Sequence, residues 1–170
     1  GVTGLAQPTG DAFYVDFVAH EIGHQFGATH SFNAEGPSAS ACNNNRTDNE
    51  NGDFPTATEE AKALAASAYE VGSGSPIMAY AGICASQNIQ FASDAYFHAR
   101  SIEQIRDFVE GELPYDNANG SICGQSSNTN DVIPLVEAGD NFIIPSQTPF
   151  VLTGSATDTD SLEETFLFTW

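Results

Sequence analysis

The chain has 170 residues, with 4 Lys+Arg against 23 Asp+Glu and a formal net charge of −19 at pH 7. Because nucleic-acid backbones and anionic membrane surfaces are bound mainly through Lys and Arg, this charge excludes nucleic acid as a partner and disfavours an anionic membrane surface. Hydrophobic residues make up 41% of the chain, which is enough for a packed core. No apolar run approaches the roughly 20 residues that cross a bilayer, so the composition predicts a globular acidic protein or a piece of one.

The first predicted element is a helix over residues 8–27, in which Asp11 can act as the N-terminal cap. Gly27 is expected to end it, because glycine adopts the left-handed conformation of a helix terminus without a steric penalty. The apolar residues that recur every four positions in this helix are Tyr14, Val18, Ile22 and Phe26.

A long loop and a second helix are predicted next. Residues 31–58 are rich in Asn, Asp, Gly and Ser and lack periodicity, which is typical of a loop. Residues 101–110 predict a helix that begins with a capping-box pair, Ser101 and Gln104, and ends at Gly111. Its apolar stripe is expected to pack on the first helix and consists of Ile102, Ile105, Phe108 and Val109.

The C-terminal part of the chain has the pattern of short strands. A polar stretch, 121–130, reads as a linker. Four strand-like segments follow, separated by Gly, Pro and Asp turns at the spacing of a β-sandwich. They are residues 132–136, 141–145, 149–156 and 165–170. Because a sandwich of this type needs about 100 residues, we expect only its first strands here.

The cysteines point to the compartment. Cys42, Cys84 and Cys123, in a chain with one Met, are typical of a secreted or extracellular protein with disulfides. Three cysteines cannot all pair with one another. One partner is therefore expected outside this chain, and a free buried thiol is the alternative.

The segment HEIGHQFGATH, residues 20–30, carries the chemistry. His20 and His24 lie four apart, so a helix places both imidazoles on one face, where they can ligate a single ion. Gly27 lets the chain turn back, so that His30 approaches as the third ligand of a zinc ion that keeps one position open for water. Glu21 lies beside that face, where a general base for this water is needed. The alternative is an amphipathic helix whose histidines are ordinary surface or core groups.

These residues resemble a known group. HExxHxxGxxH followed by a methionine-containing turn, here SPIMAY at residues 75–80, is similar to the signature of the metzincin zinc endopeptidases. Over roughly residues 8–123 the chain looks most like bacterial secreted reprolysin-like metallopeptidases. The resemblance implies that Met78 forms a hydrophobic floor beneath the zinc ligands. It also implies that Tyr80 can donate a hydrogen bond to the oxyanion, with a packing aromatic as the equal alternative.

The resemblance also implies a fold. We expect an α+β structure: the lower, C-terminal part of a metzincin catalytic domain, mainly helices and irregular loops, plus a few β-strands of a truncated β-sandwich. The upper subdomain that precedes the zinc helix in the family is expected to be missing and to belong to the upstream part of the precursor. The expected organisation is a metzincin zinc-binding catalytic region at 1–120, a linker at 121–130 and a partial immunoglobulin-like β-sandwich at 131–170.

Two features bear on the family pattern. Ser31 follows the third histidine, where reprolysins usually have Asp, so the subfamily stays open. Cys42 and Cys84 flank the loop and the methionine turn, and we expect them to form a disulfide that braces the lower part of the site. Cys123 is then left over and, as in similar reprolysins, is expected to reach the upper subdomain.

The sequence therefore predicts a secreted zinc-dependent endopeptidase that acts on a protein or peptide substrate through a metal-activated water, with Glu21 as general base. The alternatives are a non-catalytic, zinc-stabilised fragment acting as a binding or adhesion module and, last, a calcium-dependent adhesion protein. Calcium is a second candidate cofactor, because Asp158 and Asp160 alternate on a loop, although solvated turn residues are the commoner explanation.

Overall fold

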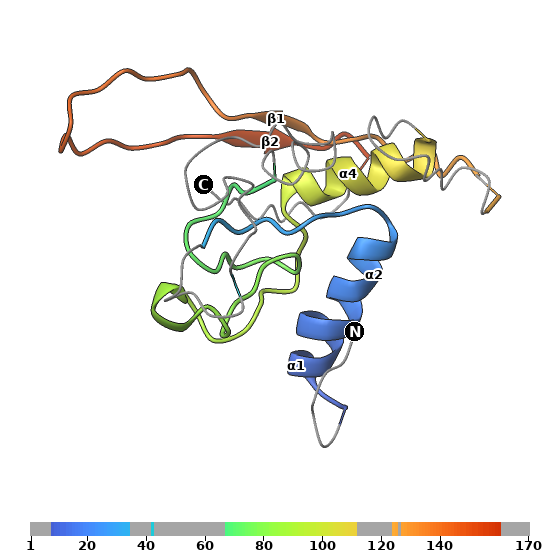
Figure 1. Ribbon diagram of the computed structural model, residues 1–170. Helices are drawn as coiled ribbons and strands as arrows, with labels where there is room; N and C mark the ends of the chain where they lie inside the picture. Colours follow the sequence, from blue (N-terminus) through green and yellow to red (C-terminus); the bar gives the residue numbers. More distant parts are fainter. Residues whose placement is uncertain (1–7, 35–41, 43–66, 112–123, 126, 161–170) are drawn as a thin grey trace, which may run out of the picture. The chain divides into compact units, whose positions relative to one another are not determined.

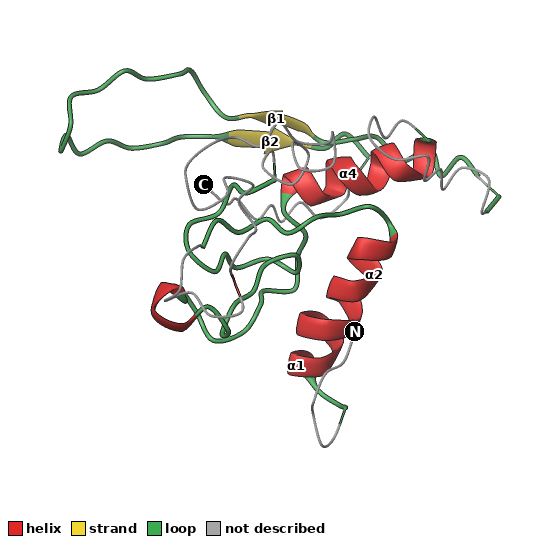
Figure 2. Ribbon diagram, viewed as in Figure 1, coloured by secondary structure: helices red, strands yellow, loops and turns green. Residues whose placement is uncertain are grey.

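The computed structural model describes residues 8–34, 42, 67–111, 124–125 and 127–160. The chain divides into two compact units, Gly1–Gln125 and Ser126–Trp170, and the boundary falls inside the predicted linker. The described helices lie in the first unit and a two-stranded sheet in the second, so the predicted mixed α+β class is confirmed (Figure 2). Cys123 and the strand predicted at 165–170 lie outside the described residues.

The first helical region consists of three consecutive segments (Figure 1). They are α1 (Asp11–Phe13), the π-helix η1 (Tyr14–Ala19) and α2 (His20–Gln25). The N-cap of α1 is Gly10, with no side-chain cap, so the prediction that Asp11 caps the helix is wrong and its carboxylate belongs to the first turn. The chain leaves α2 through Phe26 and Gly27.

The buried face of this helical region differs from its apolar repeat. Val15 and Ala19 pack against the core, and His20 and Gly23 are buried. The side chains that repeat every four positions are instead 37–54% exposed; they are Tyr14, Val18, Ile22 and Phe26. The partner segment determines which face of the helical region is buried. Gly23 lies directly against Met78, which leaves no room for a larger side chain there.

Two clusters of buried residues form the core of the first unit. The cluster beneath α2 consists of Ala28, Ile77 and Met78, with Val15, Ala19, Phe97 and Ile105 packed against it. The other cluster consists of Phe32, Ala34, Cys42 and Cys84, with Tyr80 packed against it. Cys42 and Cys84 form a disulfide. The chain passes from this disulfide into a short 3₁₀ helix, η3 (Ala85–Gln87).

The later helix, α4 (Ala99–Glu110), begins two residues before the prediction and ends at Gly111, whose φ is +80°. His98 is its N-cap, and its Nδ1 accepts a hydrogen bond of 3.1 Å from the backbone N–H of Arg100. The predicted capping box is therefore wrong: Ser101 and Gln104 lie inside the helix and are both buried.

The predicted apolar stripe of α4 is only partly used. Ile105 packs against the cluster that contains Met78, and the Phe108 ring meets that of Phe26 with ring centroids 6.1 Å apart. Ile102 and Val109 are 57% and 45% exposed. The helix turns the polar Gln104 inward because its amide completes hydrogen bonds described below.

The second unit contains two short antiparallel strands, β1 (Leu135–Glu137) and β2 (Ser155–Thr157), with Val136 opposite Ala156. The segment 141–145, predicted as a strand, is not one, because it lies in the exposed connection between β1 and β2. Two strands of three residues each bury little surface. None of the described helices is long and apolar enough to cross a membrane.

Candidate metal centre

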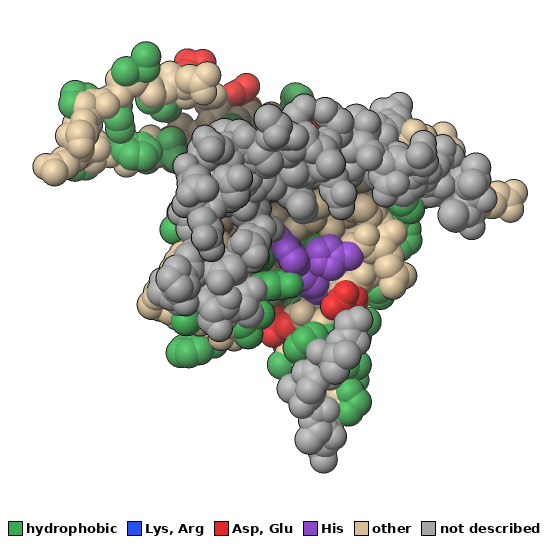
Figure 3. Space-filling model, in the orientation of Figure 1, with side chains coloured by type: hydrophobic (Ala, Val, Ile, Leu, Met, Phe, Trp, Pro, Cys, Tyr) green, Lys and Arg blue, Asp and Glu red, His purple; other side chains and the backbone are tan. Residues whose placement is uncertain are grey.

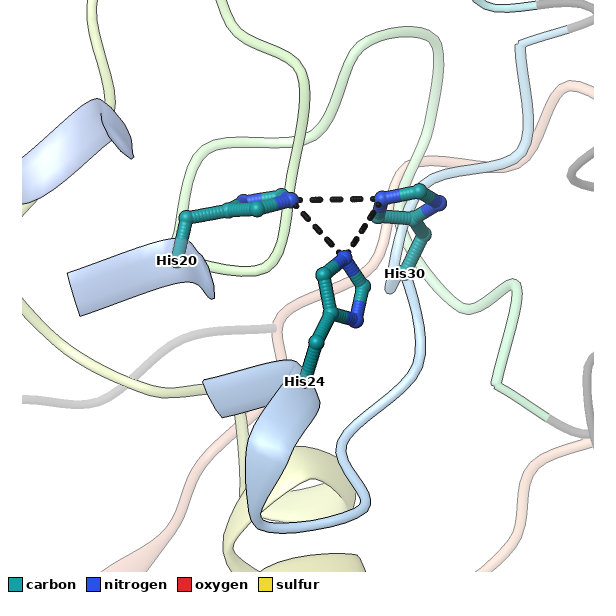
Figure 4. A group of neighbouring side chains, drawn as sticks. All are labelled: His20, His24 and His30. Carbon is teal, nitrogen blue, oxygen red and sulfur yellow. Dashed lines mark hydrogen bonds between the residues drawn. The ribbon is translucent and has the colours of Figure 1, made fainter. Parts of the chain in front are cut away.

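Three histidines converge on one point at the end of the first helical region. His20 and His24 come from α2 and His30 from the segment that follows it, and their rings face one another (Figure 4). The Nε2 atom of His24 lies 3.1 Å from those of both His20 and His30, and the Nε2 atoms of His20 and His30 are 3.2 Å apart. A tetrahedral zinc ion with Zn–N bonds of about 2.0–2.1 Å needs ligand atoms roughly 3.3 Å apart. The three Nε2 atoms fit that spacing.

Backbone carbonyls set the tautomers of two of these rings. His20 Nδ1 donates to the carbonyl of Ile77 at 2.6 Å, and His24 Nδ1 donates to that of Ala28 at 2.7 Å. Because a carbonyl only accepts, each Nδ1 carries the proton and each Nε2 presents a lone pair. Two lone pairs that face each other at 3.1 Å repel unless a cation lies between them. This donor set fits a metal ion, and such outer hydrogen bonds are what orients metal-binding imidazoles in proteins.

Burial favours the neutral, ligating form of His20. The side chain is only 5% exposed, and this desolvation lowers the pKa of His20 below its ordinary value. Its hydrogen bond to the Ile77 carbonyl opposes the shift without cancelling it. At neutral pH the imidazole is therefore uncharged, and its Nε2 carries no proton.

The turn after α2 brings His30 to the other two. Gly27 has a φ of +84°, and its N–H donates to the carbonyl of His24. The N–H of Ala28 donates to the carbonyl of Gly23. These two bonds are the Schellman ending of a helix, which requires a residue in the left-handed region. The chain reverses within three residues, so His30 approaches from outside the helix.

Hydrogen bonds fix both neighbours of His30. The N–H of Thr29 donates to Gln104 Oε1 at 3.1 Å, and the N–H of Ser31 donates to the carbonyl of Met78 at 3.1 Å. Gln104 Nε2 also donates to Thr29 Oγ1 at 2.9 Å and to Ser67 Oγ at 3.0 Å. Sequence reasoning assigned Gln104 to a helix cap and missed this role. The local sequence gives no signal for it, because Glu103, Arg106 and Asp107 of the same helix are polar as well.

Met78 lies in a buried cluster, directly against Gly23 of α2. Its role as a floor beneath the histidines stays a prediction. The Met78 side chain is fully buried, and a Cβ on Gly23 would collide with its Sδ. The turn that carries Met78 is closed by hydrogen bonds from Ala79 to Pro76 and from Tyr80 to Ser73, both 2.9 Å. Met78 thus fills the space between α2 and the turn and joins them through side-chain packing.

Glu70 supplies a carboxylate near Ser31, the position where the family pattern has Asp. Ser31 Oγ donates to Glu70 Oε2 at 3.1 Å, and the Glu70 N–H donates to the Ser31 carbonyl at 2.8 Å. Ser75, at the start of the methionine turn, donates to the same carboxylate at 3.4 Å. Burial raises the pKa of Glu70, and the Ser31 and Ser75 hydrogen bonds partly oppose the shift. This carboxylate links the segment after His30 to the turn.

Glu21 and Tyr80 line a cavity of about 320 Å³ beside His20. The Tyr80 ring stacks on Phe32 at 4.8 Å between centroids and lies 4.4 Å from His30, so the side chain packs against the core and also faces the cavity. Burial, reinforced by the charge of Glu21, raises the pKa of Tyr80 above its ordinary value of 10.0. The phenol is therefore protonated at neutral pH. Figure 3 shows histidine side chains at the surface with acidic side chains close by.

The aspartates considered for calcium hold a turn in the second unit. Asp160 Oδ2 accepts from the N–H of Val132 at 2.7 Å, and the N–H of Asp160 donates to Asp158 Oδ1 at 3.2 Å. Among the described residues, His20, His24 and His30 form the cluster whose ligand atoms suit a metal ion. Calcium at Asp158 and Asp160 stays a prediction.

Comparison with known families agrees with this geometry. The family model of metallo-peptidase family M12B, reprolysin-like, matches residues 1–108, which include the three histidines and the methionine turn. The mixed α+β arrangement is consistent with part of a metzincin catalytic domain. No match was found among curated proteins or among solved structures.

Proposed function

The chain belongs to the reprolysin-like metallopeptidases of family M12B, and we propose that it is a secreted zinc-dependent endopeptidase. The observation that carries this proposal is the convergence of three Nε2 atoms within 3.2 Å of one another. The proposed ligands are His20, His24 and His30. Secretion is supported by the Cys42–Cys84 disulfide, because disulfides persist mainly in oxidising compartments.

Zinc, when bound, supplies a Lewis acid that polarises a peptide carbonyl and makes water a better nucleophile at neutral pH. The surrounding protein supplies orientation. Ile77 and Ala28 hold the rings of His20 and His24 through their carbonyls, and Gln104 holds the segment that carries His30. Fixing ligands in this way keeps the site ready without reorganisation during the reaction.

Glu21 is the proposed general base. Glu21 lines the same cavity as His20, which precedes it in the sequence and is a proposed zinc ligand. A carboxylate oxygen in this place can take a proton from the attacking water and pass it to the leaving amine nitrogen. Tyr80 is proposed to donate its O–H to the substrate carbonyl oxygen as negative charge develops there.

The test is Glu21→Gln, which keeps the shape of the side chain but removes the base. We expect about one zinc ion per chain to remain bound while hydrolysis of denatured casein falls by about 10²–10⁴-fold. His24→Ala is the matched control and should lose both zinc and hydrolysis. Wild-type rates in the Glu21→Gln chain would remove Glu21 from the mechanism.

A second function, a zinc-stabilised binding or adhesion module, is favoured by one observation. In the second unit the apolar side chains of the described segment lie open to water, among them Ile133, Ile143 and Val151, which are 78%, 103% and 80% exposed. The proposed division at 1–120, 121–130 and 131–170 places them in an immunoglobulin-like segment. A wild-type chain that binds zinc but cleaves neither casein nor gelatin would support this second function.

A further inference from the structure

The cavity beside His20 has a chemical character that the catalytic residues do not explain. It encloses about 320 Å³, which is within the size range of sites that bind one side chain or small ligand. Its lining combines apolar groups with two carboxylates, and the residues that matter here are Asp16, Phe17, Glu21, Ile83, Phe91 and Ser93.

Apolar side chains form part of the cavity wall and are open to water. Phe91 is 97% exposed and Ile83 is 52% exposed, although both line the cavity. Phe17, from η1, is half-buried on the same cavity. Covering exposed apolar surface is favourable, so these walls suit a ligand with an apolar stem.

Asp16 places a carboxylate on this wall. It belongs to η1, the π-helical segment directly before α2, and its Oδ1 accepts a hydrogen bond of 2.8 Å from the backbone N–H of Ser93. That bond joins the helix to a segment 77 residues later and holds the carboxylate in place. Because an ionised carboxylate accepts several hydrogen bonds, one bond to Ser93 leaves acceptor capacity for a ligand.

The charge around the cavity is one-sided. Among the residues that the structure describes, its lining contains Asp16 and Glu21 but no Lys or Arg. The two described arginines, Arg100 and Arg106, pair with carboxylates on α4 itself. Figure 3 likewise shows no Lys or Arg side chain among the described residues on this face.

These features discriminate between possible occupants. An apolar side chain that fills the cavity would strip water from Asp16 without giving it a partner, which costs affinity. A cationic side chain would cover Ile83 and Phe91 with its methylene stem and give Asp16 a charge-assisted hydrogen bond. The cationic occupant is favoured by both contacts.

We propose that this cavity binds a Lys or Arg side chain of the substrate next to the scissile bond, with Asp16 as the residue that determines this preference. The inference rests on the proposed peptidase function and names its substrate class. The net charge of −19 would also attract basic peptides from a distance, so the test has to separate a local carboxylate from the overall field.

The experiment uses two internally quenched peptides that differ at one position, Lys in one and Met in the other, with that position moved stepwise across the cleavage site. For the wild-type chain we expect kcat/KM to be at least about tenfold higher for the Lys peptide at one position. In Asp16→Asn this ratio should fall to about one, because a neutral amide gains little from a cation. Asn keeps an oxygen that accepts from the Ser93 N–H, so the local fold is retained.

Asp94→Asn is the matched control. Asp94 is exposed, follows Ser93 in the chain and does not line the cavity, and the substitution removes the same single charge. Its Lys-to-Met ratio should equal that of the wild type. Equal loss of preference in both variants would assign the effect to overall charge and overturn the proposal, as would a wild-type preference for Met.

Binding separates this inference from the proposed function. Fluorescein-labelled versions of the two peptides are titrated against the Glu21→Gln chain and the Asp16→Asn/Glu21→Gln chain, and fluorescence anisotropy gives both Kd values. Tighter binding of the Lys peptide that is lost with Asp16→Asn supports the cavity assignment even if the wild-type chain hydrolyses neither peptide. Cleavage without a difference between the peptides leaves the peptidase standing and overturns the role of Asp16.

Discussion

The two units of the chain use apolar residues in opposite ways. In the first unit Phe32 and Met78 are 1% and 0% exposed, whereas in the second Ile143 and Val151 are 103% and 80% exposed. The first unit brings a helix, a methionine turn and a disulfide around shared clusters, while the described part of the second pairs two strands of three residues. A lone two-stranded ladder has no second layer to cover its faces. Apolar content alone therefore does not make a core; long-range partners do.

The largest expected effect comes from the disulfide. The double change Cys42→Ala/Cys84→Ala opens a covalent loop with a sequence separation of 42 residues, and we expect the first unit to lose about 4 kcal/mol of its free energy of unfolding in the chain-entropy account. Amide hydrogen exchange measures this for each unit separately. Protection should fall for residues 8–34 and 67–111 and stay unchanged for residues 127–160.

The control for this contrast is Ile143→Ser, at a fully exposed position of the second unit. It should change stability by less than about 0.5 kcal/mol. If the serine variant lowered protection in residues 8–34, the units would be coupled and the contrast between them would be incorrect.

An intermediate effect is expected for Gln104→Leu. The change removes the acceptor of the Thr29 N–H and the donor to Thr29 Oγ1 and Ser67 Oγ. Unpaired buried polar groups would lower the free energy of unfolding by about 1–3 kcal/mol. Because Thr29 precedes His30, zinc affinity should fall as well, which competition with a chromophoric chelator measures.

Glu103→Ala is the matched variant on the exposed side of α4. Glu103 pairs with Arg100 at 2.6 Å, and its side chain is 53% exposed. Such a surface pair contributes up to about 1 kcal/mol, and zinc affinity should not change. Unchanged zinc affinity in Gln104→Leu would show that Gln104 stabilises the fold without positioning His30.

The smallest effect concerns pH. Burial raises the pKa of Glu70 above its ordinary value of 4.5, so the folded chain holds this proton more tightly than the unfolded chain. The contribution of Glu70 to stability is therefore greatest at low pH and declines as pH rises from 4.5 through the raised folded pKa. Glu70→Gln should remove that decline, so the difference in melting temperature between variant and wild type should move in favour of the variant across this range. A constant difference would contradict the assignment.

The contrast between local and long-range contacts also explains how far sequence reasoning reaches. The helix, its end at Gly27 and the spacing of His20, His24 and His30 lie within one stretch of the chain, and the structure brings their Nε2 atoms within 3.2 Å. The mixed α+β class was predictable through the family resemblance that these residues carry. The apolar repeat did not mark the buried face of the first helical region and marked only part of that of α4, because periodicity identifies a helix but not the side that meets a partner.

By itself, the sequence determined the family and the residues able to ligate a metal, because those depend on residue types at short, regular spacing. Only the tertiary structure decided which groups support and surround them: the Ile77 carbonyl on His20, Gln104 on Thr29, and Asp16 bonded to Ser93. These pairs are 57, 75 and 77 residues apart. Contacts at such separations carry no local pattern, since they arise only when the packed chain brings distant segments together.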